Sequence, residues 1–193
     1  MPDLLEIRWH GRGGQGAKTA SILLAKIASV TGKYVQAFPE YGPERMGAPV
    51  LAYNRLDNHP VRHHCQIEAP DVVIVLDSTL VGTVDVTANI KDKGVIIINY
   101  DQQPGKLKED LGLDKNLSLY TLDANNISEE EIGKIFPNTP MLGAFNSVTD
   151  LIDKKQFMEG LKKELNKKFS KRPEIIEGNI NSVLRAYQEV KGA

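Results

Sequence analysis

The chain has 193 residues, which is enough for one well-buried core without disulfide bonds. Lysine and arginine number 24 and aspartate and glutamate 25, so the net charge is −1. This balance excludes binding through a global basic field, as most nucleic-acid and anionic-membrane proteins use. The longest apolar run, Val72–Leu76, is far below the ~20 residues that span a bilayer. The N-terminal residues carry no secretory signal, so we expect a cytoplasmic protein without membrane or nucleic-acid partners.

The first segments follow the order strand, glycine-rich loop, helix, strand. A strand is predicted over Leu5–His10, a helix over Ala17–Val30 and a second strand over Tyr34–Phe38. This order is typical of a βαβ unit of the Rossmann type. A stretch dense in turn formers, Pro39–Pro49, follows it.

The middle of the chain alternates between strands and turns. Val50–Leu56 is predicted as a strand, and Val61–Ile67 as its short partner. Three apolar runs follow, at Val72–Leu76, Val95–Asn99 and Leu117–Leu122. Such runs are typical of parallel strands that helices cover on both faces.

The C-terminal third is predicted to be helical. A short helix is expected to begin at Ser128, with Glu129, Glu130 and Glu131 in its first turn, where the helix dipole favours acidic residues. Apolar side chains at helical spacing then predict two longer helices. Nothing between the segments resembles a linker. We therefore predict one domain over residues 1–193, a three-layer α/β/α sandwich with a mostly parallel sheet and a Rossmann-like first βαβ unit.

The glycine loop is the candidate binding site. It has the spacing G-x-G-x-x-G between a strand and a helix, a context in which backbone N–H groups and the helix N-terminus bind phosphate. The alternative is a tight turn that binds nothing. The candidate cofactor-binding residues are Gly11, Arg12, Gly13, Gly14, Gln15, Gly16 and Lys18.

Two common nucleotide sites fit the loop poorly. An NAD site needs an acidic residue at the end of the second strand, but Tyr34–Phe38 has none and Glu40 lies beyond a proline. A P-loop needs lysine directly after its last glycine, and here Ala17 separates Gly16 from Lys18. Neither NAD nor ATP is therefore the favoured ligand.

Other polar residues give weaker signals. Asp77 ends an apolar strand, where it either contacts a ligand or caps the next helix. His63, His64 and Cys65 are consecutive, so on a strand their side chains alternate between faces and do not converge on one metal ion. Cys65 is also the only cysteine, so the chain by itself forms neither a disulfide nor a four-cysteine cluster. No metal site and no catalytic constellation are predicted.

Several motifs together resemble one family. The first is the glycine loop with Ala17, and the second is Gln36–Pro49, which reads QAFPEYGPERMGAP. Ala69–Asp77 and Met141–Ala144 extend the match over nearly the whole chain. The sequence resembles the gamma subunits of the 2-oxoacid:ferredoxin oxidoreductases, and among these most closely those of the pyruvate enzyme, pyruvate synthase.

The resemblance implies a subunit of an enzyme that converts pyruvate, coenzyme A and oxidised ferredoxin to acetyl-CoA, carbon dioxide and reduced ferredoxin. In this family, thiamine diphosphate with Mg²⁺ and the [4Fe–4S] clusters lie on other subunits, and the gamma domain is associated with binding coenzyme A. The implied partners are alpha, beta and delta subunits, and ferredoxin through the complex. The isolated chain is expected to be inactive.

The resemblance also points to a contact surface. The proline-braced loop displays Tyr41, Glu44, Arg45 and Met46, which we predict to face another subunit or the cofactor pocket. The alternative is an ordinary surface loop. Three functions remain open: a subunit of a pyruvate or related 2-oxoacid oxidoreductase such as the 2-ketoisovalerate enzyme, a free-standing nucleotide-binding protein, or a scaffold without a ligand.

Overall fold

The structure is a computed structural model, and it describes residues 4–40, 47–63 and 65–193. Its strands are β1 (Leu5–Arg12), β2 (Tyr34–Pro39), β3 (Pro49–Asp57), β4 (Val72–Val75), β5 (Val95–Asn99), β6 (Ser118–Leu122) and β7 (Lys191–Gly192). Its helices are α1 (Ala17–Ser29), the short 3₁₀ helix η1 (Ser78–Leu80), α2 (Pro104–Asp110), α3 (Ala124–Ile132), α4 (Asn138–Thr149), α5 (Lys154–Phe169) and α6 (Pro173–Glu189).

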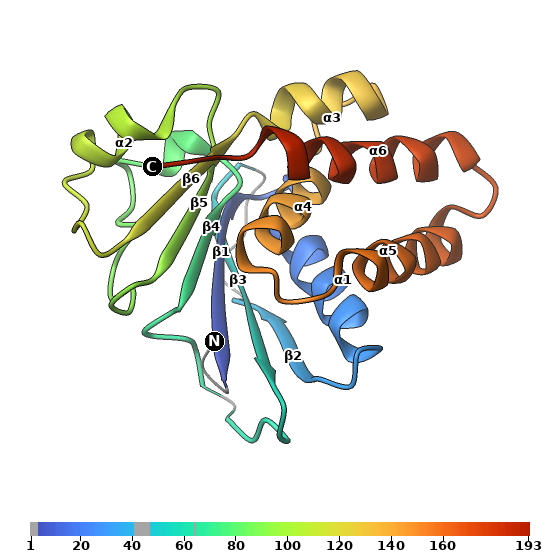
Figure 1. Cartoon of the computed structure of the whole chain (residues 1–193), viewed down its shortest axis with the longest axis horizontal. Coiled ribbons are helices and arrows are strands. Elements are labelled where there is room, and N and C mark those ends of the chain that lie inside the picture. The colour runs from blue at the N-terminus through green and yellow to red at the C-terminus, as the bar shows by residue number, and fades with distance from the viewer. Residues whose placement is uncertain (1–3, 41–46, 64) are drawn as a thin grey trace.

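All these strands form one sheet in the order β2-β3-β1-β4-β5-β6-β7 (Figure 1). Strands β1, β4, β5 and β6 pair in parallel, whereas β3 pairs antiparallel with both β1 and β2. Strand β7 is antiparallel to β6. The predicted α/β class with a mostly parallel sheet is confirmed. Within the first unit β1 and β2 are parallel as expected, but β3 lies between them, so they are not neighbours.

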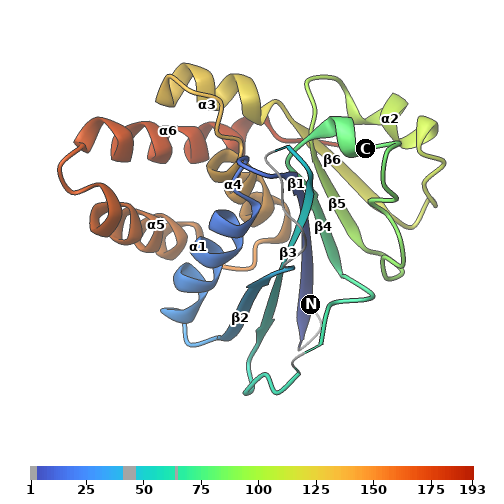
Figure 2. The same cartoon turned by 180° about the vertical axis from the view of Figure 1, so that it is seen from behind.

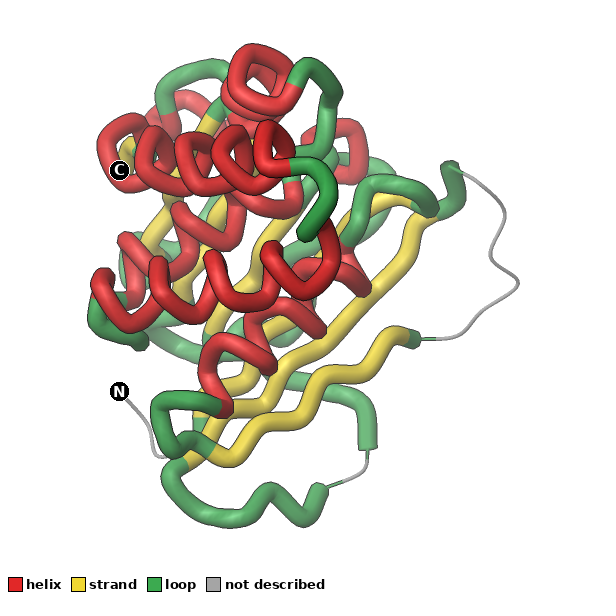
Figure 3. The backbone as a smooth tube through the Cα atoms, turned by 90° about the vertical axis from the view of Figure 1, so that its right-hand side faces the viewer, coloured by secondary structure: helices red, strands yellow, loops and turns green. Residues whose placement is uncertain are grey.

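The two faces of the sheet are covered unequally. Helices α1, α3, α4, α5 and α6 lie on one side, and only η1 and α2 lie on the other (Figures 1 and 2). Figure 3 shows the stacked helices in front of the strands. The larger apolar core fills the space under the helices, and a smaller one lies beneath η1 and α2. Within the described residues no helix combines the length and the apolar character needed to cross a bilayer.

The side chains of β1 point alternately to the two faces of the sheet. Ile7 and Trp9 are fully buried in the core under the helices. Because successive side chains on a strand point to opposite faces, Arg8 and His10 face the other side. The indole Nε1 of Trp9 donates to Asn54 Oδ1 on β3 at 2.8 Å, so β1 and β3 are also joined within the core.

The predicted strand over Val61–Ile67 is wrong, since residues 61–63 and 65–67 form no strand. Their carbonyl groups are instead bound by side chains of the sheet. The Arg55 guanidinium donates to the carbonyl oxygens of Cys65 and Gln66, at 2.8 and 3.2 Å. Gln36 Nε2 donates to Val61 O at 3.3 Å. These side-chain contacts replace the backbone ladder of a strand.

The predicted start of the helix at Ser128 is also wrong. Helix α3 begins at Ala124, because Asp123 caps it by accepting a hydrogen bond from Asn126 N at 3.0 Å. Glu129–Glu131 therefore lie in its last turns, where acidic residues are unfavourable. Arg185 of α6 compensates, with Nη1 at 2.6 Å from Glu130 and 3.2 Å from Glu131.

Gly178 is required where α6 crosses α3. A Cβ at this position would lie 2.2 Å from the carbonyl oxygen of Glu131, a backbone atom that cannot rotate away. We predict that Gly178→Ala forces the helices apart and lowers the free energy of unfolding by about 1–3 kcal/mol. Gly105→Ala on α2 is the matched control, because its Cβ would meet nothing within 4 Å. Denaturant melts of both variants test this, and equal stability of the two would contradict it.

Candidate functional site

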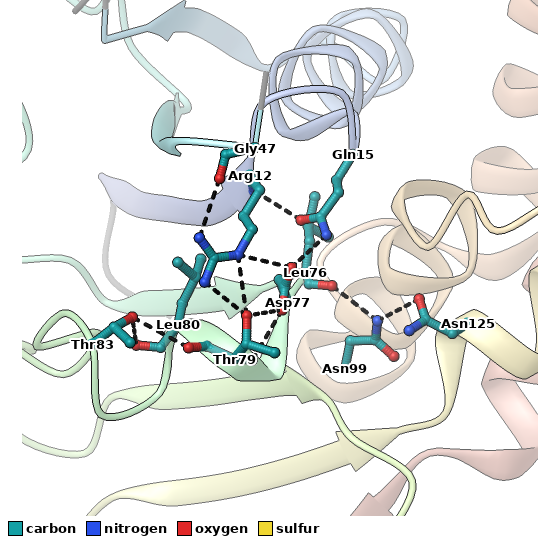
Figure 4. Close-up of polar contacts among 10 residues, drawn as sticks. All are labelled: Arg12, Gln15, Gly47, Leu76, Asp77, Thr79, Leu80, Thr83, Asn99 and Asn125. Carbon is teal, nitrogen blue, oxygen red and sulfur yellow. Dashed lines mark hydrogen bonds and ion pairs between the residues drawn. The ribbon is translucent and has the colours of Figure 1, made fainter. Parts of the chain in front are cut away.

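The carboxyl ends of the parallel strands meet at one edge of the sheet, where α/β proteins bind ligands. Arg12 ends β1, Asp77 follows β4 and Asn99 ends β5. The glycine loop connects β1 to α1 at this same edge. Figure 4 shows Arg12 and Asp77 directed toward each other, with Asn99 beside them directed toward Leu76 and Asn125.

The loop is shorter than the sequence suggested, because Gly11 and Arg12 belong to β1. Gly14 and Gly16 have φ angles of 100° and 87°, in the left-handed region that favours glycine. Gly13 N–H donates to the carbonyl of Ala48 at 2.9 Å, which holds the loop against the start of β3. Of the three glycines in the G-x-G-x-x-G spacing, Gly16 alone has a left-handed φ angle, while Gly14 occupies one of the variable positions.

Gln15 and Asp77 brace the loop from inside. Gln15 Nε2 donates to Asp77 Oδ2 at 2.5 Å, while Gln15 Oε1 accepts from Arg12 N at 2.8 Å. Asp77 Oδ1 accepts from Thr79 N and Oγ1, at 2.9 and 2.6 Å. Asp77 therefore caps η1, which was one of the two roles considered for it, and also holds the glycine loop through Gln15.

Burial raises the pKa of Asp77, but the hydrogen bonds from Thr79 and Gln15 together with the Arg12 charge outweigh it. The pKa of Asp77 is therefore lowered from its ordinary value. The side chain remains a carboxylate at neutral pH, as its donors require.

Arg12 is directed toward η1 and the chain at Gly47. Its Nε and Nη2 donate to Thr79 Oγ1 at 3.1 and 2.8 Å, and its Nη1 to Gly47 O at 3.1 Å. Its Nε also lies 3.3 Å from Asp77 Oδ2. A phosphate contact by Arg12 stays a prediction, and so does one by Lys18, which is exposed on the first turn of α1.

Asn99 is a residue of this edge that the sequence analysis did not select. Its Nδ2 donates to Leu76 O and to Asn125 Oδ1, both at 2.9 Å, and its Oδ1 accepts from Ala124 N at 2.9 Å. It therefore joins the ends of β4 and β5 to the start of α3. The signal in the sequence was an asparagine at the end of an apolar run.

A groove of about 770 Å³ opens beside the loop on the helix side of the sheet. Gly14, Gly16 and Thr19 form its end at the glycine loop, and Phe136 and Phe169 provide apolar surface. Its charged lining residues are five basic ones and one acidic one, namely Lys26, Lys134, Lys167, Lys168, Arg172 and Glu164. We call this the basic groove. Its charge contrasts with the overall net charge of −1.

The predicted contact surface and one of the consecutive histidines lie outside the described residues. They are Tyr41, Glu44, Arg45 and Met46 of that surface, and His64. Across residues 4–40, 47–63 and 65–193, no three histidine, cysteine, aspartate or glutamate side chains are grouped as a metal ion would require.

Comparison with known proteins identifies the family. The family model for pyruvate ferredoxin/flavodoxin oxidoreductase matches residues 6–189. The chain belongs to this family. Pyruvate synthase subunit PorC of Thermotoga maritima is 42% identical over 188 residues, covering 96% of this chain and 94% of that protein. The common gamma subunit of the pyruvate/ketoisovalerate oxidoreductases of Pyrococcus furiosus is 43% identical over 188 residues, covering 97% and 98%.

A solved structure of a pyruvate ferredoxin/flavodoxin oxidoreductase subunit supports the same assignment. The crystal structure of PORC from T. maritima superposes with a TM-score of 0.85 at 39% identity, covering all of this chain and 99% of that one. The resemblance inferred from the glycine loop and Gln36–Pro49 is thus confirmed, and the α/β fold agrees with that of a family member.

We predict that Asp77→Asn lowers stability at neutral pH by about 1–3 kcal/mol, since the amide replaces an ionised acceptor of charge-assisted hydrogen bonds. Because the folded-state pKa of Asp77 is lowered, its stabilisation is present above the unfolded pKa of about 3.9 and is lost as pH falls through the folded value. The difference in melting temperature between the two proteins should therefore narrow below about pH 4. Exposed Asp92→Asn is the control, and a difference independent of pH would contradict the assignment.

Proposed function

We propose that this chain is the gamma subunit of a 2-oxoacid:ferredoxin oxidoreductase that acts on pyruvate. Family membership over residues 6–189 carries the proposal. It is supported by relatives named as pyruvate synthase subunit PorC, which match over nearly their full length. The reaction converts pyruvate, coenzyme A and oxidised ferredoxin to acetyl-CoA, carbon dioxide and reduced ferredoxin. The proposed location is the cytoplasm.

In this proposal, alpha, beta and delta subunits hold thiamine diphosphate with Mg²⁺ and the iron–sulfur clusters. The donor set of this chain does not suit a cluster, since Cys65 is its single thiol and is exposed. Thiamine and the clusters supply the carbon–carbon cleavage and the electron transfer. The contribution of this chain is to bind and orient a substrate.

We assign coenzyme A to the basic groove, with its phosphates at the end formed by the glycine loop. Gly14 lines the groove, and a Cβ on it would meet nothing within 4 Å, so the backbone there is open to a ligand. Gly16, the N-cap of α1, lines the same end of the groove, and a helix N-terminus favours negative charge. Lys134 and Arg172 add positive charge along the walls, and the phenylalanine side chains suit the uncharged part of the molecule.

Binding at a braced loop contributes orientation. The thiol of coenzyme A has to meet one acyl carbon, so fixing its nucleotide end raises the effective concentration of the sulfur. The hydrogen bonds from Gln15 and Gly13 hold the loop in place before a ligand arrives. Less conformational entropy is then lost on binding.

We predict that the purified chain alone contains no stoichiometric iron and does not reduce a dye with pyruvate, and that adding it to the partner subunits restores this activity. Metal analysis and dye reduction measure both properties, with 2-ketoisovalerate as a second substrate. Turnover by the isolated chain would contradict the subunit assignment. Full activity of the partners without it would do so as well.

A second prediction concerns Thr19→Glu in the reconstituted complex. Thr19 is exposed in the first turn of α1 and lines the basic groove. Glutamate there suits the helix dipole, so the fold is retained, but its charge repels a bound phosphate. We expect the apparent KM for coenzyme A to rise about tenfold or more, with pyruvate-dependent reduction in the absence of coenzyme A unchanged.

The matched control is Asn58→Glu, which adds the same charge at an exposed turn beyond the opposite end of β3. It should leave the KM for coenzyme A unchanged. An unaltered KM in the assembled Thr19→Glu complex would show that the glycine loop is only a turn.

A further inference from the structure

A second cavity, of about 530 Å³, lies on the face of the sheet opposite the basic groove. Arg8 and His10 of β1 form its floor, together with Tyr53 of β3. The apolar residues of its walls come from β3 and the residue before it, and from the chain after β4. They are Ala48, Pro49, Val50, Leu51, Leu80, Val84 and Ala88. We call it the Arg8–His10 pocket, and the proposal for it goes beyond the function proposed above.

Arg8 is only partly paired. It is 7% exposed, and its Nε donates to His10 Nε2 at 3.0 Å. Its Nη2 donates to the carbonyl oxygens of Val86 and Ala88, at 3.2 and 2.7 Å. Both hydrogens of Nη1 remain without an acceptor among the described residues.

His10 presents a second donor. It is 5% exposed. Since Nε2 accepts from Arg8, the ring hydrogen is on Nδ1, which has no acceptor in the part of the chain that the structure describes. Burial and the Arg8 charge lower the pKa of His10 to about 3, so this neutral form persists at physiological pH.

Neither donor atom is sealed inside the protein. Among described residues, the only fully enclosed side-chain polar atom without a partner is Gln36 Oε1. Arg8 Nη1 and His10 Nδ1 are therefore open to the pocket that both side chains line. Two nine-tenths buried residues thus offer hydrogen-bond donors for which residues 4–40, 47–63 and 65–193 provide no acceptor.

The charges around the pocket select the kind of acceptor. Glu40 accepts from the Tyr53 hydroxyl at 2.8 Å, and Asp85 lies exposed at the rim. With one guanidinium against these two carboxylates, a dianion such as phosphate is disfavoured. A single carboxylate satisfies both donors, and the apolar walls accommodate a short aliphatic tail.

We propose that the Arg8–His10 pocket binds a small aliphatic monocarboxylate, with its carboxylate on Arg8 Nη1 and His10 Nδ1 and its tail against Leu51, Leu80 and Val84. This ligand is a free small molecule, held on the face of the sheet that the large helices leave uncovered. The site is separate from the basic groove, so it stands or falls independently of the coenzyme A assignment.

Butyrate is the probe, and binding is measured by calorimetry and by NMR of ¹⁵N-labelled Arg8 and His10 in the full chain. We expect butyrate to bind and to shift both signals, with butyramide and phosphate at least about tenfold weaker. His10→Met removes the donor and should lower butyrate affinity about tenfold, whereas His10→Gln should restore it by donating from its amide. His59→Met, an exposed histidine, is the control.

A second variant avoids the hydrogen-bond network. Ala48→Phe fills the pocket from its wall and leaves Arg8 and His10 in place, so it should abolish butyrate binding while the melting transition stays cooperative. Absence of butyrate binding, tighter binding of phosphate, or butyrate binding unaffected by His10→Met and Ala48→Phe would each overturn the proposal. The assembled complex provides a further comparison. Loss of butyrate binding in the complex would overturn the proposal that the ligand is a free small molecule, and would indicate that a carboxylate of a partner subunit occupies the pocket.

Discussion

Strand β1 is constrained on both edges and both faces, and the rest of the structure depends on this constraint. It pairs with β3 on one side and with β4 on the other. Ile7 and Trp9 face the core under the helices, and Arg8 and His10 face the opposite side. A slip of one residue would place the Arg8 guanidinium and the His10 imidazole in the apolar core and remove the indole from it. The register of β1 therefore fixes both the packing and the place where the glycine loop begins.

From that fixed start, the loop receives its shape through hydrogen bonds. Gly13 is bound to Ala48, which directly precedes β3 on one side of β1. Gln15 is bound to Asp77, which follows β4 on the other side. Arg12 then extends the same network to Thr79 of η1. Apolar packing alone leaves a polar loop free to move, whereas these contacts define one conformation.

The sequence allowed the fold class, most strands and the two long C-terminal helices to be predicted, because these have strong apolar periodicity. It did not reveal that β3 inserts between β1 and β2, since strand order depends on long-range pairing such as the Trp9–Asn54 contact. The strand predicted near Val61–Ile67 failed because the Arg55 side chain bonds to that segment. A tertiary contact of this kind leaves no local pattern.

For the site, the glycine loop could be located from the sequence. The role of Asp77 stayed open, because a residue after a buried strand can either cap the next helix or contact a ligand. Nothing in the sequence indicated Arg8 and His10. Their alternation with Ile7 and Trp9 is the usual signal of a strand that is half-exposed, yet both are nine-tenths buried. Only the chain after β4, which packs over them, converts two apparently solvated side chains into the floor of a pocket.

The two cavities lie on opposite faces of the sheet and differ in the charge of the residues that line them. The basic groove has an excess of cationic residues and the N-terminus of a helix, and so favours a polyanion. The Arg8–His10 pocket has one cation, a neutral imidazole and two carboxylates, a balance that disfavours a polyanion. Ala48 connects them, since it lines the pocket and its carbonyl oxygen accepts from Gly13 of the loop. One backbone hydrogen bond thus joins the wall of the pocket to the loop that ends the groove.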